Sequence, residues 1–381
     1  MDFSFTNEQQ ELKASVIEFA KKELNRDLAR HEAAEEFPRE AWRACARFGI
    51  QGLPVPSEYG GSASDIMSTV LVMEGLGYAC RDNGLIFSLN AQMWSMELPL
   101  LEFGTAAQRK KYLPGLVSGD MIGVHAMTEP DSGSDAFSLR TRAALKDGNY
   151  VLNGSKLYIT NAPVADVVIV FATLRPGTGF AGISAFLVEK GNPGFSVGSP
   201  LKKMGLRTSP MSEVILRDCQ IPVSSRLGRE GNGMAIFNSS IEWERACILA
   251  SAVGAMQRQL EECVEYARTR KQFGQPIGRF QSISNKISDM YLRLESARLM
   301  IYRVAWLKQQ GKPAIAEAAA AKTLTSEAWV QSCLDAIQIH GAYGYMRDSG
   351  IERDLRDSVA GTIYSGTSEI QRLIIARALG L

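Results

Sequence analysis

Apolar residues recur along the chain at two different spacings, and the spacing changes twice. From about residue 7 to residue 119, and again after residue 228, they repeat at the period of amphipathic helices. The stretch between consists of short β-rich segments separated by turns such as the one at residues 147–149. We expect strands at residues 139–145, 150–160, 166–173, 183–188, 195–197 and 213–216. This order predicts an α+β protein of three domains: N-terminal helical (1–120), central β (121–227) and C-terminal helical (228–381).

One acidic residue falls inside the apolar stripe of a long helical run that we predict over residues 232–269. A step of 100° per residue places Ile241, Glu244 and Ile248 in one narrow sector. A carboxylate that loses hydration without a fixed cation binds its proton more tightly, so its pKa rises toward neutrality. Such a group is suited to act as a general base. On the pattern alone the alternative stays open, in which the stripe frays and Glu244 is solvated or ion-paired.

Composition and charge exclude several classes of function. Lysine and arginine number 42 against 41 aspartates and glutamates, so no global field attracts nucleic acid or an anionic membrane. The six cysteines lie far apart without a CxxC pair, and the three histidines lack ligand spacing, so we expect reduced thiols and no metal site. The first residues resemble no secretory leader, and no apolar stretch approaches the ~18 residues of a membrane span. We expect a cytoplasmic protein.

Two short motifs are misleading. Gly177, Gly179 and Gly182 spell GxGxxG, but the residues that follow, ISAFLVEK, predict a strand rather than the helix that a dinucleotide fingerprint requires. We therefore interpret these glycines as a hairpin loop. The segment SPLK at residues 199–202 matches the SxxK of acyl-serine enzymes but lacks their accompanying motifs, so we treat it as chance.

Three polar segments carry candidate chemistry, each with a plainer alternative. TEPDSGSD at residues 128–135 offers backbone amides to an electron-rich ligand, although a simple domain linker has a similar composition. RTRKQFGQPIGRFQ at residues 268–281 gathers cations that suit a phosphate group and a solvated helix end equally. YSGTSEIQR at residues 364–372 places Thr367 or Ser368 as the N-cap of a final helix, with Glu369 favourable to its macrodipole. A helix start of this kind also binds a phosphate or a carbonyl oxygen.

In their order and spacing, these segments resemble the successive cofactor and substrate motifs of the acyl-CoA dehydrogenase superfamily. The resemblance includes KLYITNA at residues 156–162 and QIHGAYGY at residues 338–345, and it extends from Phe5 to Leu381. It implies an FAD enzyme with an N-terminal helical domain, a central β-barrel and a C-terminal four-helix bundle. It also implies assembly as a homotetramer.

The resemblance implies roles for individual residues. The residues expected to face the flavin ring are Met127, Thr128, Tyr158, Ile159 and Thr160, with Thr160 near N5. The residues expected near the FAD diphosphate and adenine are Arg270 and Phe273 of a neighbouring subunit, with Gln281, Gln338 and Gly341. Thr367 and Glu369 contact FAD again. Ser134 lies by a flavin phosphate or the pantetheine arm, and the substrate contacts are Ser134, Arg245, Tyr364 and Gly366.

Ser365 departs from the family pattern. Most members carry at this position, in an IYEGT motif, the glutamate that removes the α-proton of the substrate, and a serine hydroxyl is far too weak a base for that task. A minority, including isovaleryl-CoA dehydrogenases, carries the glutamate on the long helix directly before an arginine, where this chain has Glu244 and Arg245. The backbone amide of Ser365 can still donate to a thioester carbonyl. Arg245 either orients Glu244 or nearby backbone, or forms an ion pair with Glu242 or another carboxylate.

SSIEWERAC at residues 239–247, together with YSGTSE, looks most like the prolyl-carrier-protein dehydrogenases of secondary metabolism. That resemblance implies oxidation of an L-prolyl group tethered as a thioester to an acyl or peptidyl carrier protein, giving a pyrroline or pyrrole. Glu244 would take the α-proton while the β-hydride passes to the flavin. Three alternatives stay open: a short branched-chain acyl-CoA dehydrogenase, an oxidase using oxygen rather than an electron-transfer flavoprotein, and a catalytically silent flavoprotein or carrier-binding scaffold.

Overall fold

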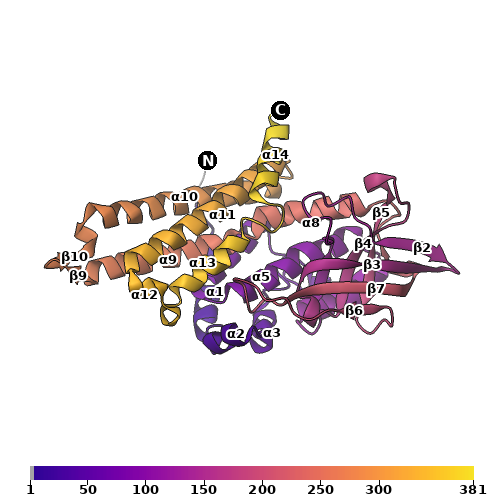
Figure 1. Ribbon diagram of the computed structural model, residues 1–381, viewed down its shortest axis with the longest axis horizontal. Coiled ribbons are helices and arrows are strands. Elements are labelled where there is room, and N and C mark those ends of the chain that lie inside the picture. Colours follow the sequence, from indigo (N-terminus) through magenta and orange to yellow (C-terminus); the bar gives the residue numbers. More distant parts are fainter. Residues whose placement is uncertain (1–3) are drawn as a thin grey trace.

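The computed structural model describes residues 4–381, in which two helical parts pack on each other and a β-sheet lies at one end of the molecule (Figure 1). The first helical part is built around α4, which is apolar along almost its whole length and packs against α1 and against α9 of the second helical part. A helix that is apolar on every side is stable only when it is surrounded. The elements of this part are α1 (Asn7–Glu23), α2 (Leu28–Ala34), α3 (Arg39–Phe48), α4 (Ile66–Ala79), α5 (Asn83–Gln92), the π-helical turn η2 (Met93–Glu97), α6 (Leu98–Phe103) and α7 (Ala106–Val117).

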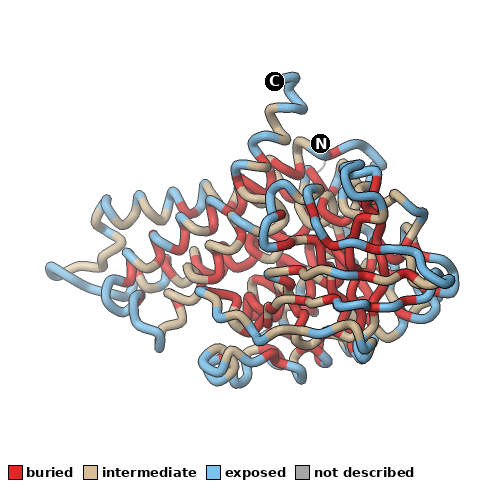
Figure 2. The backbone as a smooth tube through the Cα atoms, turned by 45° about the vertical axis from the view of Figure 1, so that its right-hand side comes forward, coloured by how far each residue is buried: buried red, intermediate tan, exposed pale blue. Residues whose placement is uncertain are grey.

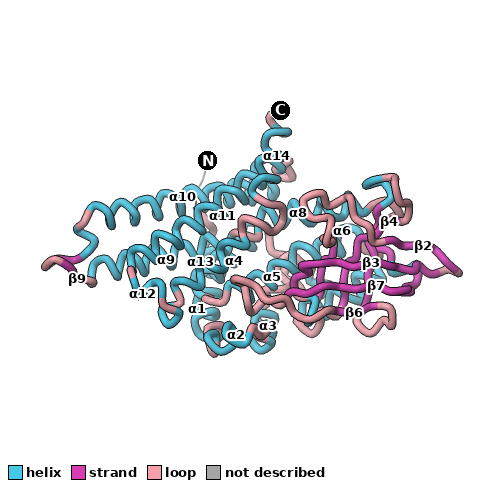
Figure 3. The backbone as a smooth tube through the Cα atoms, viewed as in Figure 1, coloured by secondary structure: helices cyan, strands magenta, loops and turns pink. Residues whose placement is uncertain are grey.

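The predicted order of a helical part, a β part and a second helical part is confirmed, but the sheet is open and does not close into the predicted β-barrel (Figure 3). Its strands follow the order β6-β7-β3-β2-β4-β5-β8, and β1 pairs in parallel with β4. Within residues 4–381 the outermost strands β6 and β8, three and two residues long, pair with β7 and β5 alone. The strands are β1 (Gly123–Ala126), β2 (Arg142–Lys146), β3 (Asn149–Thr160), β4 (Val167–Thr173), β5 (Ile183–Glu189), β6 (Phe195–Val197), β7 (Met211–Pro222) and β8 (Arg226–Leu227).

Two of the predicted turns are confirmed. Residues 147–148 join the antiparallel strands β2 and β3. The GxGxxG glycines lie in the loop of the antiparallel β4–β5 hairpin, where η4 (Gly179–Gly182) is a single 3-10 turn, so they form no dinucleotide fingerprint. The other 3-10 turns are η1 (Ser57–Tyr59), η3 (Ala162–Val164), η5 (Val223–Ser225), η6 (Ile277–Arg279) and η7 (Arg347–Ser349).

The second helical part departs from the prediction at one point, because the expected run over residues 232–269 is two helices. Ile248 and Leu249 interrupt it, and the second helix, α9, crosses α4 at a very short distance. A Cβ atom on Gly254 would lie 1.9 Å from the carbonyl oxygen of Glu74, so only glycine fits this crossing. The elements are α8 (Gly233–Cys247), α9 (Ala250–Thr269), β9 (Lys271–Gln272), β10 (Gln275–Pro276), α10 (Gln281–Gln309), α11 (Ile315–His340), α12 (Ala342–Tyr345), α13 (Ile351–Ala360) and α14 (Ser368–Ala378).

The main apolar core runs through the sheet and both helical parts, and Figure 2 shows this continuous buried interior. It includes Trp42 of α3, Val170 of β4 and Val253 of α9, each at most 1% exposed. All six cysteines are free and buried, as expected for packing residues. Among the described helices, none has the length and apolarity that a membrane crossing needs.

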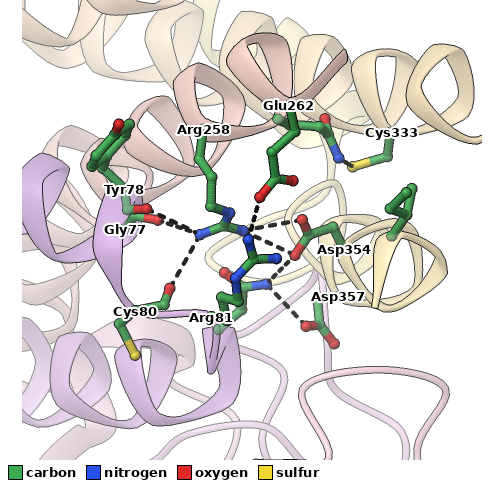
Figure 4. A network of polar contacts seen from close by, with 12 residues as sticks. Gly77, Tyr78, Cys80, Arg81, Arg258, Glu262, Cys333, Asp354 and Asp357 are labelled. Carbon is green, nitrogen blue, oxygen red and sulfur yellow. Dashed lines mark hydrogen bonds and ion pairs between the residues drawn. The ribbon is translucent and has the colours of Figure 1, made fainter. Parts of the chain in front are cut away.

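A buried arginine of α9 connects α4 and α13 through hydrogen bonds (Figure 4). Arg258 Nη1 donates to the carbonyl oxygens of Gly77 at 2.9 Å and Cys80 at 3.2 Å, and Nη2 donates to Asp354 at 3.0 Å. Asn83 Nδ2 donates to the same carboxylate at 3.0 Å. A buried charge needs such partners, because an unpaired one loses its hydration without compensation.

We therefore expect Asp354→Ala to destabilise the protein, because it leaves the Arg258 guanidinium buried without a counter-charge. The loss of unfolding free energy should be about 3–5 kcal/mol. Urea unfolding at a fixed protein concentration measures it. The control is Glu317→Ala, which removes the partly exposed partner of the exposed Arg303 and should cost about 0–1 kcal/mol. Equal costs for the two variants would contradict this view of the network.

Candidate active site

Both carboxylate oxygens of Glu244 accept hydrogen bonds from serine hydroxyls. Ser365 Oγ, from the loop before α14, donates to Glu244 Oε2 at 2.6 Å. Ser95 Oγ, from η2, donates to Oε1. Burial raises the pKa of Glu244, while the hydrogen bonds from Ser365 and Ser95 act in the opposite direction. Glu244 is half-buried and α8 continues past it to Cys247, so the helix does not fray here, and the direction of the pKa shift agrees with the prediction of a partly desolvated carboxylate.

Ser95 was missed by the sequence analysis. It lies in a π-helical turn, whose extra residue per turn changes the direction of the following side chains. The neighbouring Trp94 ring stacks on Trp243 of α8 with their centroids 6.2 Å apart, which fixes the turn against the helix that carries Glu244. A serine in the apolar segment AQMWSMELP carries no local signal of this role, because the contact spans 149 positions of sequence.

The loop around Ser365 is held through its carbonyl oxygens. The Ser365 carbonyl accepts from Arg245 Nε at 3.2 Å and from Gln371 Nε2 at 3.0 Å. The next carbonyl, of Gly366, accepts from Lys322 Nζ at 2.7 Å and from Gln371 Nε2 at 2.9 Å. Burial lowers the pKa of Lys322 to about 8. Ser365 itself is in the left-handed region, with φ 53°, a conformation that needs such support in a residue other than glycine.

These contacts distinguish between the two predicted roles of the Arg245 side chain. The side chain binds backbone near Glu244, as the first alternative held. The alternative ion pair with Glu242 is wrong, because Glu242 Oε1 accepts from Lys308 Nζ at 2.7 Å instead. Lys308 also lies over the Trp243 ring, 4.2 Å from its centroid.

The N–H of Ser365 is available to a ligand. Within residues 4–381 it has no hydrogen-bond acceptor, although the carbonyl and the hydroxyl of the same residue are both bonded. Tyr364 and Gly366 flank it, and the Tyr364 ring packs against Phe87 with centroids 4.7 Å apart. Ser134, the other expected substrate contact, is exposed in the loop between β1 and β2 and has no contact with Glu244 in the described structure.

The residues expected to face a flavin ring lie together on β3 and the end of β1. A register shift between Lys156 and Ile159 opens a bulge in the β3–β7 ladder, where Leu157 N donates to the Thr128 carbonyl at 2.9 Å. Tyr158, with φ 58°, is 61% exposed there, and Thr160 is half-buried. Tyr158 and Thr160 can therefore present side chains to a planar ligand.

Two members of this group are buried. Met127 and Ile159 are only 3% exposed and their side chains belong to the apolar core, so their place beside a flavin ring stays a prediction. Ile159 is buried because the alternation of β3 turns it away from the face that carries Tyr158 and Thr160.

A buried ion pair beneath this strand was also missed. Lys156 Nζ lies 2.7 Å from Glu129 Oε1 and donates to the Met127 carbonyl at 3.1 Å. Burial lowers the pKa of Lys156 to about 8. Burial opposes ionisation of Glu129 too, but the Lys156 charge and hydrogen bonds from Lys156, Thr141 and the Arg140 N–H hold its pKa below the usual value. The pair fastens the 128–135 loop to β3.

The remaining predicted residues form two groups, one close to the Ser365 loop and one far from Glu244. Thr367 is the N-cap of α14, its Oγ1 accepting from Ile370 N at 3.4 Å, and Glu369 is exposed in the first turn. Thr367 thus follows the Ser365 loop directly. The distant group lies at the β9–β10 end of the helices, separated from Glu244 by α9, which is about 30 Å long (Figure 1). It comprises Arg270, Phe273, Gln281, Gln338 and Gly341, and the Phe273 side chain is 92% exposed. One chain therefore does not bring all the predicted residues together.

The comparisons agree with this architecture. The family models for the N-terminal, middle and C-terminal domains of acyl-CoA dehydrogenase match residues 6–120, 125–219 and 231–380. The chain is 45% identical over 381 residues to the L-prolyl-[peptidyl-carrier protein] dehydrogenase of Serratia sp., covering 100% of this chain and 99% of the relative. It is similar to the solved prolyl acyl carrier protein oxidase AnaB, with a TM-score of 0.98, 50% identity and coverage of 99% and 100%. It is equally similar in fold to PigA with FAD and proline, with a TM-score of 0.98, 45% identity and coverage of 100% of both chains. The chain belongs to the acyl-CoA dehydrogenase family.

Proposed function

We propose that the protein is an FAD-dependent dehydrogenase that oxidises an L-prolyl group carried as a thioester on a peptidyl carrier protein. The observation that carries this proposal is the Glu244 carboxylate, which is desolvated, held by two serines and adjacent to the unpaired N–H of Ser365. The substrate is inferred from relatives of about half-identical sequence whose names specify a prolyl carrier protein. The reaction would give a pyrroline or pyrrole thioester.

The described residues fit FAD in two separate places. The β3 bulge with Tyr158 and Thr160 offers a face for the flavin ring, and the cap of α14 at Thr367 lies next to the Ser365 loop. The exposed Phe273 and Arg270 suit the adenosine diphosphate end, and we infer that they serve the site of another copy in a homotetramer. When bound, FAD supplies the acceptor for the two electrons that leave the substrate.

We infer three domains, at residues 1–120, 121–227 and 228–381. The free thiols of the six cysteines support a cytoplasmic location.

The residues of the chain would hold the substrate and remove its proton. The Ser365 N–H donates to the thioester carbonyl oxygen, which stabilises the negative charge that develops there as the α-hydrogen leaves. Glu244 takes that proton on its carboxylate. The two serine hydroxyls keep both oxygens in place and favour the ionised form that is able to accept it.

The alternatives differ in substrate, in electron acceptor or in the absence of a reaction. A short branched-chain acyl-CoA dehydrogenase would use the same base and the same amide. Oxygen and an electron-transfer flavoprotein are both suitable acceptors, and release of hydrogen peroxide distinguishes the first. A silent flavoprotein or carrier-binding scaffold has no need of a carboxylate held in a desolvated position, so the geometry of Glu244 favours an active enzyme.

We expect Glu244→Gln to keep its flavin and to lose reduction of that flavin by substrate. Removal of a positioned base typically costs about 10²- to 10⁴-fold in rate. Stopped-flow bleaching under anaerobic conditions measures the rate with prolyl-carrier protein. The matched control is Glu242→Gln, two residues away on the same helix and paired with Lys308, which should stay within a few-fold of the wild type. Normal bleaching by Glu244→Gln would refute the assignment of the base.

The pH dependence of the reaction rate should change when either of the two serine hydroxyls is removed. Ser365→Ala removes a hydroxyl that donates to the ionised carboxylate, so the pKa of Glu244 rises further. The acid limb of the pH–rate profile, where the base becomes protonated, should therefore move to higher pH, and Ser95→Ala should move it in the same direction. Ser239→Ala is the control, because this half-buried serine of α8 donates to Glu102 and not to Glu244, and it should leave the limb in place. An unchanged limb in both active-site variants would count against the proposed role of the hydroxyls.

A substrate panel tests the proposed function as a whole. Purified holoenzyme should bleach rapidly with prolyl-carrier protein and slowly or not at all with isovaleryl-CoA and butyryl-CoA under anaerobic conditions. The physical reason is that a tethered prolyl group matches the relatives' named substrate and leaves no use for the adenosine end of CoA. Preference for isovaleryl-CoA would establish the branched-chain alternative instead.

A further inference from the structure

A second buried carboxyl group lies two residues from Ser95. Glu97 is the last residue of the π-helical turn η2 and is fully buried. Its Oε1 accepts a hydrogen bond from Gln92 Nε2 at 2.9 Å, and its Oε2 has no partner among residues 4–381. Burial raises the pKa of Glu97 to about 8, so at pH 7 the group is mostly a neutral carboxylic acid.

The bond between Gln92 and Glu97 spans the turn. It joins residues five apart, as does the backbone bond from the Leu98 N–H to the Met93 carbonyl, and this spacing defines a π-helical turn. In an ordinary helix of 3.6 residues per turn, side chains five apart lie on different sides. The side-chain bond therefore favours the π-helical turn over the ordinary helix.

Gln92 is itself fixed to two other segments. Its Oε1 accepts from the Gly123 N–H at the start of β1 at 2.9 Å. Its Nε2 also donates to the Leu116 carbonyl of α7 at 3.1 Å. Through Gln92, Glu97 is thus attached to backbone that does not belong to the turn.

The same turn carries the contacts with the helix of the base. Trp94 stacks on Trp243 of α8, and Ser95 donates to Glu244. Because Trp94, Ser95 and Glu97 share one turn, a change in its winding would move the Ser95 hydroxyl relative to α8.

We propose that Glu97, bonded to Gln92, is a positioning residue that maintains the winding of the turn in which Ser95 donates to Glu244. The inference rests on the proposed function, because it concerns the base of that reaction. Within the described residues, the side chain of Glu97 bonds only to Gln92 and not to the base. Its loss should therefore have the same effect on Glu244 as the loss of the Ser95 hydroxyl.

The charged groups around the two carboxyl groups are different. None of the titratable side chains on the elements packed against the turn bonds to Glu97 in the described structure. These side chains, on α6, α8 and β1, are Glu102, Glu242, Glu244, Arg245, Cys247 and His125. The cations close to Glu244 are Arg245 and Lys322, which bind carbonyl oxygens of the Ser365 loop and not of the turn.

Glu97→Leu tests the proposal, because leucine has a similar volume and accepts no hydrogen bond from Gln92. The measurement is the pH dependence of anaerobic flavin reduction by the holoenzyme, with the N-acetylcysteamine thioester of L-proline or of butyrate, whichever the wild type oxidises. The acid limb should move to higher pH by the same amount as in Ser95→Ala, because Glu244 loses the same donor. The double variant should show no further shift.

Two controls separate positioning from a loss of packing. Glu97→Gln keeps an oxygen that accepts from Gln92 and should leave the limb at its wild-type position. Gln259→Leu removes a buried polar side chain of α9 that donates to Cys333, so it should lower the Tm without moving the limb.

Glu97→Asp replaces Glu97→Leu if the latter fails to fold. It withdraws the carboxyl group from Gln92 by one methylene group and should move the limb in the same direction. A limb that stays in place in these variants while Ser95→Ala moves it, or a double variant that adds the two shifts, would overturn this inference alone. A limb that Ser95→Ala leaves in place would overturn it together with the proposed role of the hydroxyls. Failure of the wild type with the prolyl thioester alone contradicts the proposed function and not this inference.

Discussion

The structure depends on one constraint: a carboxylate must be kept out of water and yet remain able to accept a proton. Burial alone would hold Glu244 in its protonated form, and full hydration would make it a weak base. The protein resolves the conflict with two hydroxyl donors, one on each carboxylate oxygen. These donors come from positions 149 and 121 residues away in sequence, so three distant segments must meet with the accuracy of a hydrogen bond.

Buried cationic side chains hold several of these segments in place. Lys156 fastens the 128–135 loop to β3, Arg258 joins α4 to α13, and Lys322 holds the loop that contains Ser365. Each donates to backbone carbonyl oxygens as well as, in two cases, to a buried carboxylate. A cation in such a place is costly unless its partners stay fixed, so each one also restrains the loop that it binds. The site is therefore built on the core rather than on mobile surface loops.

Much of the fold followed from the sequence because its signals are local. The helical period, the β-rich centre, the β4–β5 hairpin and the Thr367 cap each depend on neighbouring residues. The errors concern long-range geometry: sheet closure depends on how β6 and β8 end, and the break at Ile248 and Leu249 depends on the crossing of α9 with α4. β1, with four residues, is too short to show a period.

The candidate active site also contains residues that the sequence indicated and residues that it did not. The burial of Glu244 was visible as an acidic position in an apolar stripe, and the loss of the usual glutamate at position 365 was visible as a departure from a motif. The contact of Ser95 with Glu244 was not visible, because it spans 149 positions of sequence and comes from a π-helical turn that no local pattern indicates. Lys322 sits in an alanine-rich helix where nothing in the sequence indicates a carbonyl partner.

The most direct test of Glu244 as the base separates proton removal from oxidation. Holoenzyme reduced beforehand with dithionite cannot accept a hydride, but it can still exchange the α-hydrogen of a prolyl thioester with deuterium oxide. Mass spectrometry of the recovered thioester measures the exchange. We expect the wild type to incorporate deuterium and Glu244→Gln to show only background incorporation. Equal incorporation by the two proteins would contradict the role of Glu244 as the base.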